Sequence, residues 1–154
     1  MRDILFRGFH RDENGTEKVF VNGEWVKGTW VYGFYVHYDD VVDCHLDDCD
    51  YIVERHNGKD FIFNEVITET VGQYVGLKDK NGKNIFYGDI IKHYNGCSVE
   101  EYSVDIGRVF FYPQTMRYLR TSTLFPDDCP AIYENNKYEV IGNIFENPEL
   151  LEEI

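Results

Sequence analysis

Lys18-Val-Phe-Val-Asn-Gly-Glu-Trp-Val-Lys27 is the stretch of sequence that decides the fold class. Runs of β-branched and aromatic residues lie on both sides of Asn22-Gly23, and such side chains favour extended strands. A type I′ hairpin turn needs positive φ at its two central residues, which Asn and Gly adopt at the least cost. The stretch therefore predicts a β-hairpin. Tyr51–Arg55 and Asp60–Phe63 flank Asn57-Gly58 in the same way and predict a second hairpin.

The segment between these hairpins, Thr29–Tyr38, has the pattern of one long strand. Gly33 in its middle indicates a bulge or the close approach of another backbone. The acidic stretch that follows predicts a loop. Alternation places five large side chains on one face of the strand, namely Trp30, Tyr32, Phe34, Val36 and Tyr38.

The second half of the chain predicts further strands and one short helix. A helix is expected after the last strand, because Asn147 is a good N-cap residue and Pro148 suits the first helical turn. A helix of barely two turns is not stable alone, so we expect it to pack on the domain. The predicted strands are Ile85–Tyr87, Ile90–Tyr94, Arg108–Tyr112 and Tyr138–Phe145.

The composition agrees with a mainly β protein. Of the 154 residues, 43% are hydrophobic, which is enough for a packed core, and the 12 Tyr and 11 Phe favour strands over helices. We therefore predict a mainly β fold with antiparallel hairpins in the N-terminal half, and an α+β fold is the alternative.

The net charge of −13 is concentrated in two segments. Asp39–Asp50 contains six Asp and no Lys or Arg, and residues 134–154 contain six Glu opposed by Lys137 alone. Binding to DNA through general electrostatic attraction needs clustered Lys and Arg, so this negative charge argues against such binding.

The first residues of the chain carry charges, and no long apolar run follows them. We therefore expect no signal peptide, no membrane span and a cytoplasmic location. Cytoplasmic thiols stay reduced, so the cysteines do not predict a disulfide framework. They are Cys44, Cys49, Cys97 and Cys129.

Four segments of the chain stand out, namely ILFRG at residues 4–8, GTWVYGFY at 28–35, TVGQYVGLKDKNGK followed by IFYGDII at 70–91, and YEVIGNIFENPELL at 138–151. Together they resemble the YopX family of phage and prophage proteins. These segments are rich in Gly, Asn and apolar residues, which specify a backbone shape before they specify chemistry.

The resemblance implies a phage- or prophage-encoded protein that self-associates, with a small, partly open SH3-like barrel in its second half. The family is generally described as being of unknown function, so no catalytic residue carries over. We divide the chain into an N-terminal β-hairpin region, residues 1–70, and an SH3-like barrel region with a C-terminal helix, residues 71–154. One continuous YopX-like domain over residues 1–154 is the alternative.

Cys44, His45 and Cys49 lie inside the acidic stretch and offer soft ligands to zinc, with Asp43 or Asp47 completing four. Their spacing matches no established zinc finger or ribbon. We favour a solvated acidic loop with incidental thiols, and we predict neither a metal nor any other cofactor.

Residues 106–126 contain no acidic residue and combine arginines with aromatic rings. Arginine beside aromatic side chains suits a phosphate or a stacked base, so this segment is a candidate surface for single-stranded nucleic acid. We favour the alternative, in which the aromatic rings are core and the arginines line a solvent face or pair with the acidic segments. The candidate residues are Arg108, Arg117, Arg120, Tyr112 and Tyr118.

No pattern of catalytic residues stands out in the sequence. The serines lie in no Gly-x-Ser-x-Gly motif, and the five histidines form no metalloprotease motif. We therefore predict a non-enzymatic accessory protein that binds itself, as a homo-oligomer, or a host or phage protein. A nucleic-acid-directed role is the second hypothesis, either through single-strand binding or through acidic segments that mimic DNA against a host DNA-binding protein.

Overall fold

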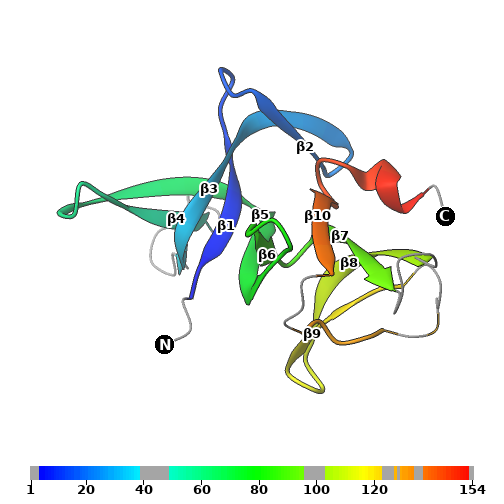
Figure 1. Ribbon diagram of the computed structural model, residues 1–154. Helices are drawn as coiled ribbons and strands as arrows, with labels where there is room; N and C mark the ends of the chain where they lie inside the picture. Colours follow the sequence, from blue (N-terminus) through cyan, green and yellow to red (C-terminus); the bar gives the residue numbers. More distant parts are fainter. Residues whose placement is uncertain are drawn as a thin grey trace. The chain divides into compact units, whose positions relative to one another are not determined.

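The computed structural model describes residues 4–38, 49–95, 103–122, 127, 129–133 and 137–152 (Figure 1). The chain divides into two compact units, Met1–Gln73 (unit 1) and Tyr74–Ile154 (unit 2). Antiparallel strands dominate both, which confirms the mainly β prediction, and the described residues contain no α-helix. Whether the two regions fold as independent domains, as our division at residue 70 supposes, stays a prediction.

Unit 1 is built on strands that close into a partial ring. β1 pairs with both β3 and β5, and β4 pairs with the same two strands on their other portions. β2 extends the sheet by pairing with β3. The strands are β1 (Phe6–Arg11), β2 (Glu17–Val21), β3 (Glu24–Tyr38), β4 (Cys49–His56) and β5 (Asp60–Lys78).

The two predicted hairpin turns are present. Asn22 and Gly23 have φ angles of 53° and 84°, and Asn57 and Gly58 have 47° and 74°, as a type I′ turn requires. Gly33 marks the close backbone approach that the sequence indicated, because a Cβ atom there would lie 2.2 Å from the Val53 carbonyl oxygen.

The core of unit 1 forms where the inward faces of β3, β4 and β5 meet. Val31, Ile52 and Val66 are buried together, and full burial of such a side chain contributes about 1.5–3 kcal/mol. Thr70 is also buried, and its hydroxyl accepts from the Phe9 amide at 2.9 Å and donates to the Ile67 carbonyl at 2.6 Å. It thereby satisfies backbone groups where the β1–β5 register shifts.

Unit 2 contains a four-stranded antiparallel sheet in the order β10-β7-β8-β9. The end of β5 continues into this unit and pairs with β6 through Tyr74 and Phe86. Whether this unit is an SH3-like barrel stays a prediction. Its elements are β6 (Asn84–Phe86), β7 (Asp89–Asn95), β8 (Ser103–Tyr112), β9 (Arg117–Arg120), β10 (Tyr138–Asn143) and the 3₁₀ helix η1 (Pro148–Leu151).

The predicted C-terminal helix is this short 3₁₀ helix, which packs against β8. Asn147 precedes it but makes no capping hydrogen bond through its side chain. That side chain lies against Gly142 instead, where a Cβ atom would be 2.5 Å from Asn147 Oδ1. No helix in the described part of the chain is long and apolar enough to cross a membrane.

Candidate functional site

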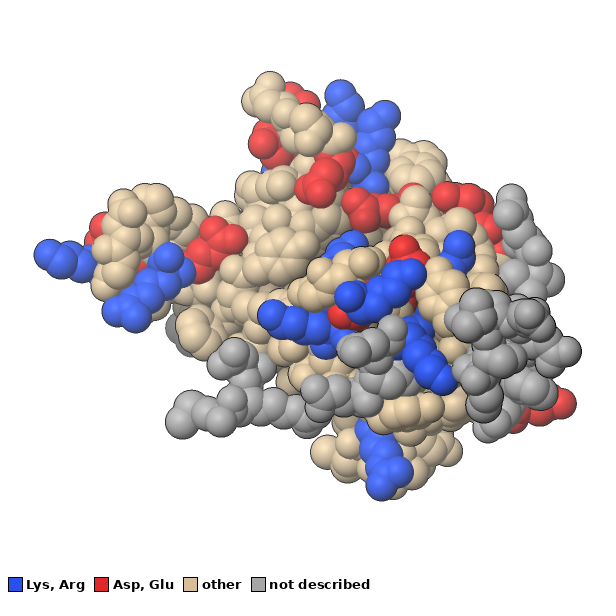
Figure 2. All heavy atoms as spheres, in the orientation of Figure 1, with Lys and Arg blue, Asp and Glu red and all other residues tan. Residues whose placement is uncertain are grey.

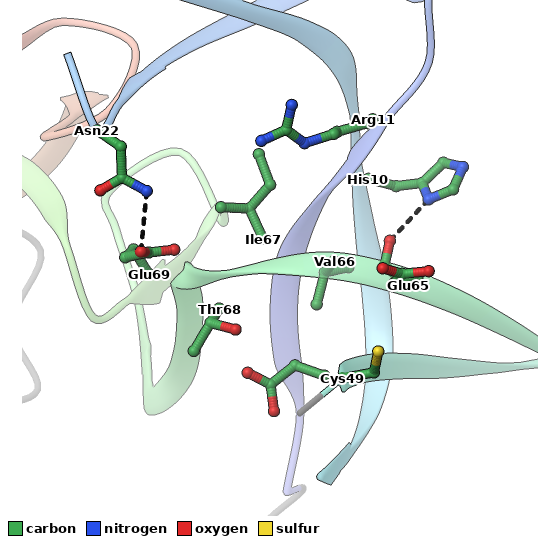
Figure 3. A pocket seen from close by; sticks show the side chains of 10 residues that line it. His10, Arg11, Asn22, Cys49, Glu65, Val66, Ile67, Thr68 and Glu69 are labelled. Carbon is green, nitrogen blue, oxygen red and sulfur yellow. Dashed lines mark hydrogen bonds between the residues drawn. The ribbon is translucent and has the colours of Figure 1, made fainter. Parts of the chain in front are cut away.

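An open groove of about 730 Å³ lies in unit 1, between residues of β1, β4 and β5 (Figure 3). Two hydrogen bonds hold its rim. His10 Nδ1 donates to the Glu65 carbonyl oxygen at 2.7 Å, and Asn22 Nδ2 donates to Glu69 Oε1 at 3.1 Å. Asp50 adds a third acidic side chain to the lining, so the groove is predominantly acidic.

Asp50 is only 2% exposed and is held by neighbouring donors. The Tyr35 hydroxyl donates to its carboxylate at 2.7 Å and His37 Nδ1 donates at 2.8 Å. Burial alone would raise the pKa of Asp50, but hydrogen bonds from Thr68, His37 and Tyr35 outweigh burial and hold the pKa below its usual value. Burial and the bond to Asp50 raise the pKa of Tyr35 to about 12. This carboxylate therefore serves the structure of the groove.

Cys49 lines the same groove, but Cys44 and His45 lie outside the described residues. Within the part of the chain that the structure describes, no group of three His, Cys, Asp or Glu is placed to hold a metal ion. The zinc alternative of the sequence is thus untested, and the groove offers no ligand set of its own.

The five residues proposed for nucleic-acid binding lie on two opposite faces of the β8–β9 hairpin. Tyr112 pairs with Arg117, and Arg108 is on the same face by the alternation of β8. Tyr118 and Arg120 alternate with Arg117 along β9 and project from the other face. Arg108, Tyr112 and Arg117 are exposed, so three of the five form one accessible surface.

Arg120 belongs to an internal polar network and is 3% exposed. Its guanidinium forms an ion pair with Asp105 and donates to His93 Nδ1 at 3.1 Å. The Ser122 hydroxyl donates to Asp105 Oδ2 at 3.0 Å, and the Tyr138 ring stacks on His93 with centroids 4.9 Å apart. Because Arg120 is buried and paired with Asp105, it is not available to a ligand.

The network also sets the protonation of His93. Burial lowers the pKa of His93, the Arg120 guanidinium lowers it further, and the Asp105 carboxylate opposes both. The neutral ring accepts at Nδ1, because Arg120 can only donate. The sequence missed this network, although Asp105 directly precedes the acid-free segment and was the nearest counter-charge to its arginines.

A large apolar surface was also missed, on the outer side of β3, β4 and β5. Pairing places Val53 between Phe34 and Phe63, and Arg55 beside Phe61. The three phenylalanines are between 58% and 62% exposed, whereas Val53 is buried between its neighbours. We call this surface the aromatic face, and it comprises Phe34, Val36, Tyr38, Tyr51, Val53, Phe61 and Phe63.

Part of this face could be predicted from the sequence. Alternation had put Phe34, Val36 and Tyr38 on one side of the long strand, and the structure shows that side exposed. Tyr51 and Phe63 join them in an edge-to-face contact with centroids 6.4 Å apart. Which side of a strand meets solvent depends on the strand's neighbours, and the local pattern does not specify those.

Comparison with known proteins identifies the family. The family model described as YopX protein matches residues 23–152. The chain belongs to the YopX family. The resemblance drawn from the four sequence segments is thereby confirmed.

The YopX-family chain is also similar to a solved structure, the crystal structure of protein EF1440 from Enterococcus faecalis. The two are 21% identical, with a TM-score of 0.47, over 98% of this chain and 99% of that one. No curated protein matches the sequence.

Proposed function

We propose that this YopX-family protein is a phage- or prophage-encoded accessory protein that performs no catalysis and acts in the cytoplasm by binding protein. Its partner is a second copy of itself or a host or phage protein. The aromatic face of unit 1 is the observation that carries this proposal, because it is the kind of surface that protein interfaces bury.

The size of the aromatic face supports a binding role. A large aromatic side chain offers roughly 150–250 Å² of surface, so the exposed members together present on the order of 500 Å² of apolar area. Single exposed apolar residues are common on soluble proteins, whereas a contiguous patch of this size is comparable to the largest patch of a typical monomer, and such patches are often functional. A standard interface buries about 800 Å² per partner, and the aromatic face supplies more than half of that area.

The acidic groove supports a binding role less directly. Two of its carboxylates, those of Asp50 and Glu69, accept hydrogen bonds within unit 1. These described residues shape the surface of unit 1, and the proposal takes no reaction chemistry from them.

A double substitution on the aromatic face tests the proposal. Phe61→Ser combined with Phe63→Ser should weaken self-association in light scattering, or capture of a partner from infected cells, by at least roughly tenfold. Met116→Ser is the matched control, since Met116 is 76% exposed in the β8–β9 loop and lies off the face. Equal binding by the wild type and the double variant in both assays would refute the proposal.

Single-stranded nucleic acid remains the second candidate partner, now with a smaller site. Arg108, Tyr112 and Arg117 share one exposed face of the β8–β9 hairpin, which supports stacking and phosphate contact there. Arg108→Ala with Arg117→Ala should reduce salt-sensitive oligonucleotide binding, and Arg120 is no part of this test because it is buried. If the wild type does not bind oligonucleotides, single-stranded nucleic acid is ruled out as the partner. The hypothesis that the acidic segments mimic DNA depends largely on acidic residues outside the described ranges.

A further inference from the structure

We infer that the occupant of the aromatic face is a second copy of this chain, packed about a two-fold axis that sets Arg55 of each copy against Glu65 of the other. This inference rests on the proposed function, because it takes the aromatic face as the binding surface. It adds the partner and its orientation.

The charges at the ends of the face are the first observation. Strand pairing places Arg55 beside Phe61 at the hairpin tip and Glu65 beside Tyr51 at the other end. Arg55 and Tyr51 are four positions apart along β4, so the two charged ends are separated by about 13 Å. Among the described residues that share this face, Arg55 and Glu65 are the charged ones.

This distribution is complementary to itself. A two-fold rotation about an axis that lies in the interface and runs across the strands exchanges the two ends of the face. Each positive end then meets a negative end, and the apolar middle meets an apolar middle. A partner with a large net charge would leave one of the two ends opposed by like charge. The Arg55 guanidinium also donates to the Gly58 carbonyl at 3.0 Å, which holds the charge at the tip of the hairpin. Figure 2 shows basic side chains at that tip, at the left of the view.

The apolar middle is the second observation. Phe34 and Phe63 stand on either side of Val53, so two copies can interdigitate their rings as the inner faces of two packed sheets do. A two-fold contact uses the face of both copies, which doubles the apolar area removed from water for one set of residues. A membrane surface is a poorer fit, because the face carries one basic and one acidic residue and no basic excess.

Charge reversal tests the arrangement in the full-length chain. In sedimentation equilibrium, wild type should form a dimer, and Arg55→Glu or Glu65→Arg alone should raise its dissociation constant roughly tenfold, since each places like charges at both symmetry-related contacts. The double variant R55E/E65R should dimerise as wild type does. An equal mixture of the two single variants should form a heterodimer, because both contacts are then complementary.

Lys59→Glu is the control, because it makes the same change of charge in the turn beside the hairpin tip and off the face. Its dissociation constant should be unchanged, and circular dichroism checks that every variant folds. A wild type that stays monomeric, or a double variant and mixture that fail to regain the dimer, overturns the inference. If the phenylalanine double variant still loses binding in that case, the aromatic face remains the binding surface and only the two-fold arrangement falls.

Discussion

Arg120 and Asp105 form an ion pair that is almost wholly excluded from solvent. Breaking a buried pair by removing one partner leaves an uncompensated charge in the interior, which costs about 3–5 kcal/mol. We therefore predict that Arg120→Met lowers the free energy of unfolding by about that amount in urea denaturation. Arg117→Met, an exposed arginine on the same strand, should stay within about 0.5 kcal/mol of wild type. Similar losses in the two variants would contradict the burial of Arg120.

His93 makes stability depend on pH. Its pKa is lowered from 6.5 in the folded protein by burial, Arg120 and Lys137, with Asp105 opposing, so the unfolded chain binds the proton more readily. The contribution of His93 to the free energy of unfolding is fully present above pH 6.5 and is lost as the pH falls below that value. We expect the free energy of unfolding to decline between pH 7 and pH 5, and to decline less in His93→Gln. Parallel curves for the two proteins would show that His93 is not responsible.

The sequence grouped Arg117 and Arg120 as candidate binding residues and could not distinguish their environments. Composition singles out Arg117 and Arg120 equally, since both stand in a segment without acids. Their roles differ because alternation along β9 turns one to solvent and the other toward Asp105. That assignment depends on the register between β8 and β9, which neither strand encodes alone.

Glycines in the strands and turns of unit 1 have different roles. Gly23 has a φ of 84° with no atom near its absent Cβ, so Gly23→Ala should cost only the backbone strain of about 1 kcal/mol. Gly33→Ala should cost roughly 3 kcal/mol, because its Cβ would strike the Val53 carbonyl and separate β3 from β4. Thermal unfolding of both variants checks the order, and a smaller loss for Gly33→Ala than for Gly23→Ala would contradict it.

Elements with strong local signals were predicted, and elements that depend on pairing were not. The signals for the turns at Asn22 and Asn57 and for the alternation of β3 lie in residues that are adjacent in the sequence. Only the first four residues of β5 were predicted as a strand, because polar residues and a register shift interrupt its later pattern. β9, four residues with two arginines, is a strand because β8 provides its hydrogen bonds.

For the molecule as a whole, substitutions on the aromatic face should affect binding much more than they affect the free energy of unfolding. Phe61→Thr with Phe63→Thr removes exposed rings, so we expect the free energy of unfolding to change by less than about 1 kcal/mol. Ile52→Ala on the opposite face of β4 should cost about 3 kcal/mol, since Ile52 is fully buried. Denaturant titration of both variants measures this. Equal losses would mean that the phenylalanines are part of the core.

β5 passes from unit 1 into unit 2 without interruption, and the strands with which its first part pairs all precede unit 2 in the chain. Every strand pair of unit 1 is complete once Gln73 has left the ribosome, whereas β7 must wait for β10 near the end of the chain. Domains generally fold N-terminal first as they emerge. If unit 1 folds independently, as we predict, the aromatic face forms on the nascent chain, and we expect the proposed pairing of two copies to begin before either polypeptide is finished.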